Sequence, residues 1–111
     1  MSAIDNAKAH FRDQGQRRIE VPEWGDERGP LVVYAEPLTL AERRRLFQRN
    51  KGDDVGLSVD LLIVKARDAD GKPLFSLDDK QALLNGVDPA EVARVAADII
   101  AAPSLEDAEK N

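Results

Sequence analysis

The pattern of polar and apolar residues predicts two short strands in the first third of the chain. In residues 17–21 (RRIEV) polar and apolar side chains alternate from Arg18 onward, and residues 31–36 (LVVYAE) are rich in β-branched and aromatic side chains. Both patterns are typical of β-strands. Between them, residues 22–30 (PEWGDERGP) combine two prolines and two glycines with acidic side chains, which is typical of a loop. We therefore expect an antiparallel hairpin with a loop over residues 22–30.

A helix is predicted from Thr39 to Asn50. Thr39 is followed three residues later by Glu42, and this spacing forms a capping box in which each side chain accepts a hydrogen bond from the other residue's backbone N–H. Leu38 precedes the cap and is available as a hydrophobic staple. Asn50 and Gly52 are typical of a helix end.

A second capped helix is predicted near the end of the chain. Asp88 is the N-cap, Pro89 occupies the first helical position, and Glu91 completes a capping box. We expect Pro103 to end this helix. One apolar stripe with the spacing i, i+3, i+4, i+7, i+8 follows the cap; it consists of Val92, Val95, Ala96, Ile99 and Ile100.

Two further segments lie between these helices. Residues 57–66 are rich in Leu, Ile and Val, and residues 61–64 alone could be a buried strand, so both structures remain open. We favour the helix, because the apolar-to-polar pattern extends over three turns. Residues 76–86 predict another helix, with Ser76 and Asp79 at the capping positions and Asn85-Gly86 as the stop.

These elements predict an α+β domain, a small antiparallel hairpin followed by and packed on a bundle of about four short helices, because a lone hairpin is marginally stable in water. The domain spans residues 17–102. Residues 1–16 form a polar arm or a short helix, in which Ile4 and Phe11 are seven positions apart. Residues 103–111 are expected to be a flexible acidic tail.

Composition and charge narrow the class of protein. The chain has 111 residues, no cysteine and a net charge of −5, which excludes disulfides and cysteine metal sites. Residues 1–51 hold ten Lys/Arg and eight Asp/Glu, a net charge of +2, whereas residues 52–111 hold six and thirteen, a net charge of −7. This uneven charge distribution favours association with proteins, including copies of the chain packed front to back. The alternative is that the charged side chains of both halves are simply exposed to solvent.

The same features argue against nucleic acid and membrane partners. An acidic chain repels nucleic acid at long range. The longest unbroken apolar run has five residues, far fewer than the roughly 20 of a membrane helix. Because the first residues lack the basic flank and apolar core of a signal peptide, we expect a cytoplasmic protein.

Catalytic and metal sites need side chains that this sequence does not group. His10 is the sole histidine and lies in the polar arm, without a partner for a zinc site. Residues 68–71 (DADG) lack the spacing of a calcium loop and predict a turn. The paired acids at residues 53–54 and 78–79 are expected to cap helices. We predict no catalytic, cofactor-binding or metal-binding residue, and a binding protein instead of an enzyme.

Contacts with a partner are predicted for aromatic and basic residues. Trp24 either folds over the hairpin or remains partly exposed as an anchor. The run of three arginines, with Arg49 one turn later, is either a solvated helix face or a grip on an acidic partner, since arginine binds carboxylates bidentately. The predicted contact residues are Trp24, Arg43, Arg44, Arg45, Phe47 and Phe75.

Four segments, in this order and spacing, resemble a known family. They are EVPEWG (residues 20–25), AEPLTLAERRRL (residues 35–46), DADGKPLFSLDD (residues 68–79), and a terminal helix followed by LEDAEKN (residues 105–111). Over nearly the whole chain they are similar to the tail assembly chaperones of long-tailed siphophages and related prophages.

The resemblance implies a small domain that coats the tape-measure protein in the cytoplasm of the host bacterium. Such a protein keeps the tape-measure protein soluble, brings tail-tube subunits to it and leaves before the tail is finished, so it is not expected in the mature virion. The family has no catalytic or metal residues to transfer. Two other functions remain open, a structural tail or connector protein that stays in the particle and a small nucleic-acid-binding regulator.

Overall fold

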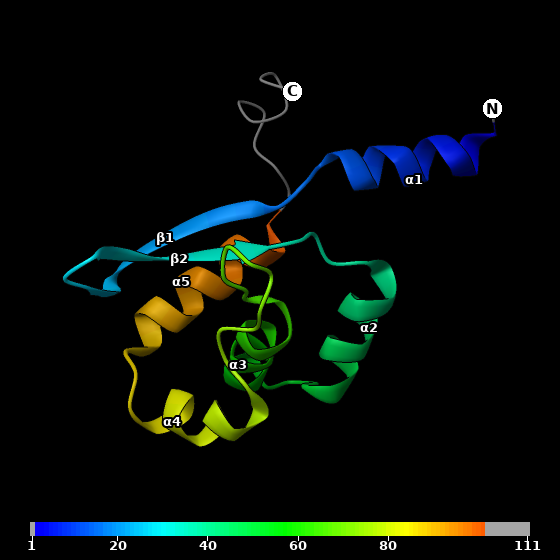
Figure 1. Ribbon diagram of the computed structural model, residues 1–111. Coiled ribbons are helices and arrows are strands. Elements are labelled where there is room, and N and C mark those ends of the chain that lie inside the picture. The colour runs from blue at the N-terminus through cyan, green and yellow to red at the C-terminus, as the bar shows by residue number, and fades with distance from the viewer. Residues whose placement is uncertain (1, 102–111) are drawn as a thin grey trace.

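The computed structural model describes residues 2–101, which form one β-hairpin and a group of helices (Figure 1). The predicted α+β class is confirmed, because an antiparallel hairpin precedes the helical bundle and packs on it. The elements are α1 (Ala3–Asp13), β1 (Arg17–Asp26), β2 (Gly29–Ala35), α2 (Leu40–Arg49), α3 (Asp54–Lys65), the 3₁₀ turn η1 (Leu77–Asp79), α4 (Lys80–Asn85) and α5 (Pro89–Ile100).

The hairpin buries one face and exposes the other. β1 and β2 pair antiparallel, with Ile19 opposite Val33. Because successive side chains of a strand point to opposite faces, Ile19, Val21 and Val33 all enter the core. On the solvent face, Arg18 and Glu20 form an ion pair of 2.8 Å. The alternation of residues 17–21 therefore predicts this strand and its buried face.

The predicted loop over residues 22–30 is wrong, because the two strands continue through most of it. β1 extends to Asp26 and β2 begins at Gly29, which leaves a short turn between them. The pairing register shifts between Val21 and Asp26, and such a bulge accommodates residues that cannot join a regular ladder. Gly25 is required there, since a Cβ at this position would collide with the carbonyl oxygen of Gly29.

Helix α3 is the central element of the bundle, in contact with α2, α4 and α5. The structure resolves the choice for residues 57–66 in favour of the helix, as predicted. Asp53 caps it, since its carboxylate accepts a 2.9 Å hydrogen bond from the backbone N–H of Gly56. Packing on several sides explains the nearly continuous apolar sequence. The buried residues of α3 are Gly56, Val59, Asp60, Leu61, Leu62 and Lys65.

Helix α5 covers the hairpin and packs on α3. The predicted N-cap is confirmed: Asp88 accepts a 2.9 Å hydrogen bond from the backbone N–H of Ala90, and Pro89 is the first helical residue. The predicted capping box does not form, because the Glu91 carboxylate instead accepts a 3.1 Å hydrogen bond from Arg94 Nε. The predicted stripe is its buried face, with Val92, Val95, Ala96 and Ile99 in the core. The helix ends at Ile100; the predicted stop at Pro103 and the acidic tail over residues 103–111 lie outside the described residues.

The helix predicted over residues 76–86 forms in two parts. Ser76 and Asp79 make the predicted capping box, in which Asp79 accepts a 2.8 Å hydrogen bond from the backbone N–H of Ser76. The first turn is the 3₁₀ turn η1, and α4 follows from Lys80 to Asn85. Leu83 is the only residue of η1 and α4 that is buried. The contact with α3 therefore needs only a short helix.

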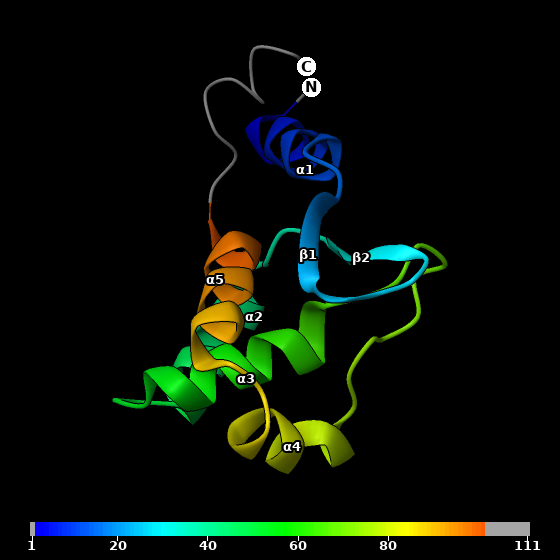
Figure 2. The same ribbon diagram turned by 90° about the vertical axis from the view of Figure 1, so that its left-hand side faces the viewer.

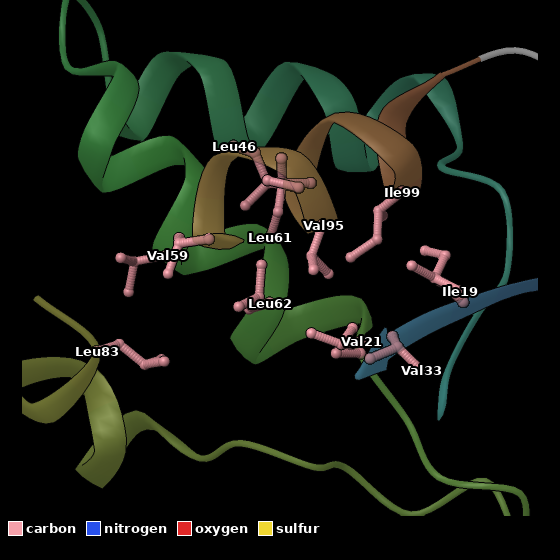
Figure 3. Close-up of a cluster of buried hydrophobic side chains, with 14 residues drawn as sticks. Ile19, Val21, Val33, Leu46, Val59, Leu61, Leu62, Leu83, Val95 and Ile99 are labelled. Atoms are coloured by element: carbon pink, nitrogen blue, oxygen red, sulfur yellow. The ribbon is translucent and has the colours of Figure 1, made fainter. Parts of the chain in front are cut away.

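The core lies where the hairpin meets the helices. Figure 3 shows side chains from both strands and from α2, α3, α4 and α5 converging on one cluster. Leu62, Ile99, Val21, Val33, Val59 and Val95 are its largest fully buried members. Burial of such side chains supplies most of the driving force for folding, about 1.5–3 kcal/mol each.

The N-terminal arm is helical, which decides between the two structures left open for residues 1–16. α1 begins after Ser2, whose hydroxyl oxygen accepts a 3.2 Å hydrogen bond from the backbone N–H of Asp5. None of its residues is buried. α1 continues from β1 away from the rest of the molecule (Figures 1 and 2).

The segment between α3 and η1 lies along the outer edge of β2. Tyr34 and Arg67 exchange two backbone hydrogen bonds of 2.8 and 2.9 Å. The turn predicted for residues 68–71 is confirmed, because the Asp68 carboxylate accepts 2.9 Å hydrogen bonds from the backbone N–H groups of Asp70 and Lys72. The segment thus shields part of a sheet edge that would otherwise be open to pairing.

Candidate partner-binding face of helix α2

The first turn of α2 is anchored by the predicted capping box. Thr39 Oγ1 accepts a hydrogen bond from the backbone N–H of Glu42, and the Glu42 carboxylate accepts one from the backbone N–H of Thr39, both at 3.0 Å. The same carboxylate accepts hydrogen bonds of 3.2 and 3.3 Å from Lys65 Nζ at the end of α3. Glu42 therefore closes the cap and also joins α2 to α3.

The last turn of α2 is held by Asp60, a carboxylate on α3 that is only 4% exposed. Its Oδ2 accepts hydrogen bonds from Asn50 Nδ2 at 2.8 Å and from Arg49 Nε at 3.1 Å. Its Oδ1 lies 3.6 Å from Lys80 Nζ at the start of α4. Asn50 also donates to the carbonyl oxygen of Leu46 at 3.0 Å. One carboxylate thus ties together three helices.

Both carboxylates have lowered pKa values, because their partners outweigh burial. Burial acts to raise the pKa of Asp60, but the hydrogen bond from Asn50 and the charges of Arg49 and Lys80 bring it below the usual value. For Glu42, burial again acts to raise the pKa, and hydrogen bonds from the Thr39 backbone and from Lys65 bring it below the usual value. Two ionised groups therefore hold the two ends of α2 and determine which side of the helix faces outward.

In this orientation α2 presents apolar side chains to the solvent. Leu46 is buried on the inner side, whereas Leu40 and Phe47 point about 100–120° away from it and are 86% and 44% exposed. They are seven positions apart, or about two turns, with Arg44 between them. A shallow, open surface depression follows this side. We name it the α2 outer face; it is lined by Leu40, Ala41, Arg43, Arg44 and Phe47.

The α2 outer face has the chemistry of a site for another helix. Single exposed apolar residues are common on protein surfaces, but two of them at a spacing of two turns form one apolar stripe along α2, and such a stripe can pack against the apolar stripe of another helix. Arg43 and Arg44 border these anchors, and a guanidinium group pairs with carboxylates bidentately. The face is therefore suited to an amphipathic helix that carries acidic side chains beside its apolar stripe.

The predicted arginine run does not form a single surface. Adjacent residues of a helix point about 100° apart, so Arg43 and Arg44 line the outer face whereas Arg45 is exposed beside it. Arg49 turns to the inner side and pairs with Asp60, although its side chain is still 60% exposed. Two of the four arginines considered for partner binding thus belong to the candidate site.

Trp24 and Phe75 form a separate cluster within the molecule. Their rings pack edge to face, with centroids 6.0 Å apart and an interplanar angle of 81°. Both are partly buried against the core, as expected for a Trp that folds over the hairpin. The turn of the hairpin and α2 lie on opposite sides of the molecule (Figure 1). The six predicted contact residues therefore do not meet in one place, and Phe47, Arg43 and Arg44 are the ones brought together.

Sequence reasoning missed two residues that matter for the site. Leu40 follows the cap residue Thr39 and was not predicted as a contact residue. Its spacing to Arg44 (i+4) and Phe47 (i+7) places these three residues along one side of the helix and could have identified it. Asp60 lies in an apolar run, and its partners Asn50 and Lys80 come from segments on either side along the chain. Such a buried carboxylate has no local sequence signature.

Other features complete the description of residues 2–101. His10 is exposed on α1. Within this range, no helix combines the length and apolar character needed to cross a lipid bilayer. No family model, curated protein or solved structure matches the chain.

Proposed function

We propose that this protein is a tail assembly chaperone of a siphophage or prophage, which binds the tape-measure protein through the α2 outer face. In the host cytoplasm it keeps the tape-measure protein soluble, brings tail-tube subunits to it, and leaves before the virion is complete. Two supports come together: the ordered sequence segments that resemble this family, and a face suited to a helical partner.

The exposed apolar pair on α2 is the observation that carries the proposal. Leu40 and Phe47 are exposed while the helix that bears them is held by ionised groups at both ends. Packing within the described residues does not explain why this helix is apolar on two sides. Covering the pair with a partner would bury two large apolar side chains, each contributing up to about 1.5–3 kcal/mol.

Binding of this kind works by mass action and needs no energy source. A long helical protein with exposed apolar stripes aggregates through those stripes. When a chaperone occupies a stripe, the soluble complex is favoured in proportion to the concentration and affinity of the chaperone. Arg43 and Arg44 would favour stripes bordered by acidic residues, because a stripe bordered by basic residues would be repelled by the two guanidinium groups.

A protein partner fits the face better than nucleic acid does. Phosphate contacts need several cations on one surface, whereas here two arginines border two apolar side chains. The net charge of −5 also opposes an approach to a polyanion. An interaction with an acidic helix uses both the apolar and the basic parts of the face.

The test is co-expression with the tape-measure protein encoded by the same phage or prophage. We expect the soluble fraction of a tape-measure fragment to rise when the wild-type protein is present and to fall back when Leu40→Ser and Phe47→Ser are combined. Loss of both anchors should weaken binding at least tenfold. Leu77→Ser is the matched control, because Leu77 is also exposed (71%) but lies on η1.

Unchanged solubility of the fragment with the wild-type protein would refute the chaperone function. If the Leu77 variant lost activity as fully as the α2 variant, binding by the α2 outer face would be refuted instead. Mass spectrometry of purified virions separates a chaperone from a structural tail or connector protein: the chaperone is absent from the particle, and stoichiometric retention would contradict the proposal.

A further inference from the structure

Helix α1 carries an apolar stripe that no other described element covers. Ile4 and Phe11 are 63% and 39% exposed and lie seven positions apart, with Ala7 between them. The spacing i, i+3, i+7 places the three side chains on one side of the helix. No residue of α1 is buried.

A helix of this length needs a partner. α1 has 11 residues, and isolated helices shorter than about 12–15 residues are marginal in water. The cap from Ser2 satisfies one backbone N–H, and caps of this kind contribute only about 1 kcal/mol. Stable α1 therefore implies that something packs on its stripe.

We propose that α1 is a self-association arm, which pairs antiparallel with α1 of a second copy of this chain. An axis of twofold symmetry near Ala7 and Lys8 places Ile4 of each copy opposite Phe11 of the other. Both large apolar residues then meet a large apolar residue, and the small Ala7 side chain near the axis allows the helices to approach closely. A twofold interface uses the same patch on both copies, and the stripe meets this requirement.

The charges of α1 fit the same arrangement. Asp5 and Arg12 are seven positions apart and therefore lie along the same edge of the stripe. In the antiparallel pair, Asp5 of each copy comes within reach of Arg12 of the other, which gives two opposite-charge contacts. In a parallel pair the two charged edges would lie on opposite sides of the contact, so Asp5 of one copy would be out of reach of Arg12 of the other. Lys8 lies near the axis on this edge, and its long side chain can extend into solvent.

Two copies of an acidic protein repel each other, but the charges of α1 itself cancel. Asp5 and Asp13 balance Lys8 and Arg12, so α1 carries no net charge apart from His10. Because α1 leads away from the hairpin and the bundle (Figures 1 and 2), the two bodies need not collide.

A second copy's α2 outer face is a poorer occupant of the stripe. Leu40 and Phe47 have the same seven-residue spacing as Ile4 and Phe11. However, Lys8 borders the α1 stripe and would meet Arg44 when the apolar pairs are aligned antiparallel, which is unfavourable. Self-pairing of α1 also brings the two Lys8 side chains close to one another, but it adds two contacts between Asp5 and Arg12, whereas α2 has Ala41 and Gln48 at the corresponding positions.

Two helices of this length bury less than the roughly 1,200–2,000 Å² of a standard interface. The dimer is therefore expected to be weak and to depend on concentration. Sedimentation velocity of the full chain over a wide concentration range should show reversible monomer–dimer exchange. Self-pairing requires no tape-measure protein, so the result of this test is independent of whether the proposed function is correct.

Charge reversal provides the decisive variants. Asp5→Arg gives a chain with an arginine at both ends of the pairing edge, and Arg12→Asp gives a chain with an aspartate at both ends. Each variant alone should dimerise at least tenfold more weakly than the wild type. An equimolar mixture should regain dimerisation, because the heterodimer again has two opposite-charge contacts. Asp13→Arg is the matched control, since Asp13 lies on the far side of α1 from the stripe, and it should dimerise like the wild type.

Three results would overturn the proposal. The wild type could remain monomeric at the highest soluble concentration, the two variants could dimerise like the Asp13→Arg control, or the mixture could dimerise no better than its components. A chain ending at residue 102 tests the C-terminal residues as a different occupant. Unchanged dimerisation of that chain supports self-pairing, whereas dimerisation that appears only in the shortened chain would place residues 103–111 on the stripe and contradict it.

Discussion

The carboxylate of Asp60 is expected to be the polar group on which the orientation of α2 depends most. Asp60→Ala removes the acceptor of hydrogen bonds from Asn50 and Arg49 and the ionic partner of Lys80. The Asn50 hydrogen bond, made to a charged group, is worth about 1.5–3 kcal/mol. Arg49 and Lys80 are 60% and 37% exposed, so solvent screening limits each of their contributions to about 0–1 kcal/mol. We expect the free energy of unfolding to fall by about 2–4 kcal/mol.

Urea denaturation followed by the fluorescence of Trp24, the only tryptophan, measures this change. For a domain of this size the midpoint should fall by about 0.7–4 M urea, given a slope of about 1–3 kcal/mol per M. Asp60→Asn should lower the free energy of unfolding less than Asp60→Ala does, because its amide oxygen can still accept the hydrogen bond from Asn50. The control is Asp70→Ala, which removes an exposed carboxylate from a turn.

The effect of Asp60 should also depend on pH. Its pKa in the folded protein is lowered, so its stabilising contribution is fully present above the unfolded value of about 3.9 and is lost as the pH falls through the folded pKa. The difference between wild type and Asp60→Ala should therefore be full at pH 7 and shrink below about pH 4. Equal midpoints for Asp60→Ala and Asp70→Ala at pH 7 would refute the reasoning.

Three more predictions concern the free energy of unfolding. Thr39→Ala removes the cap of α2 and should cost about 1 kcal/mol, whereas Thr39→Ser should cost much less; equal losses would exclude the cap as the cause. Gly25→Ala places a Cβ against the facing backbone of the hairpin and should cost about 1–3 kcal/mol; an unchanged midpoint would contradict the close approach. Trp24→Leu and Phe75→Leu should be coupled by about 0.5–1.5 kcal/mol in a double-mutant cycle followed by circular dichroism, and additive losses would argue against the edge-to-face contact.

Local signals in the sequence predict most of the helices. The capping residues Thr39 and Asp88 lie where two helices start, and the apolar stripe of α5 faces the core. For α3 the periodicity was weak, because a helix that packs on three neighbours is apolar on several sides. The extent of the apolar-to-polar pattern, over three turns, favours a helix over a strand here.

The failures come from contacts between distant residues. Pro22 and Gly25 indicate a loop when judged locally, but pairing of the strands carries the ladder past them through a bulge. The contact between Trp24 and Phe75 joins residues far apart in the chain. Likewise, the burial of Asp60 depends on groups from α2 and α4 that only the folded bundle brings together.

Nuclear magnetic resonance titration with a soluble tape-measure fragment tests the central claim most directly. In the ¹⁵N-labelled protein, the backbone amide signals of Leu40, Arg44 and Phe47 should shift as the fragment is added, and those of Trp24 and Phe75 should stay in place. Shifts concentrated on the hairpin and Phe75, or no shifts at a saturating concentration of the fragment, would contradict binding through the α2 outer face.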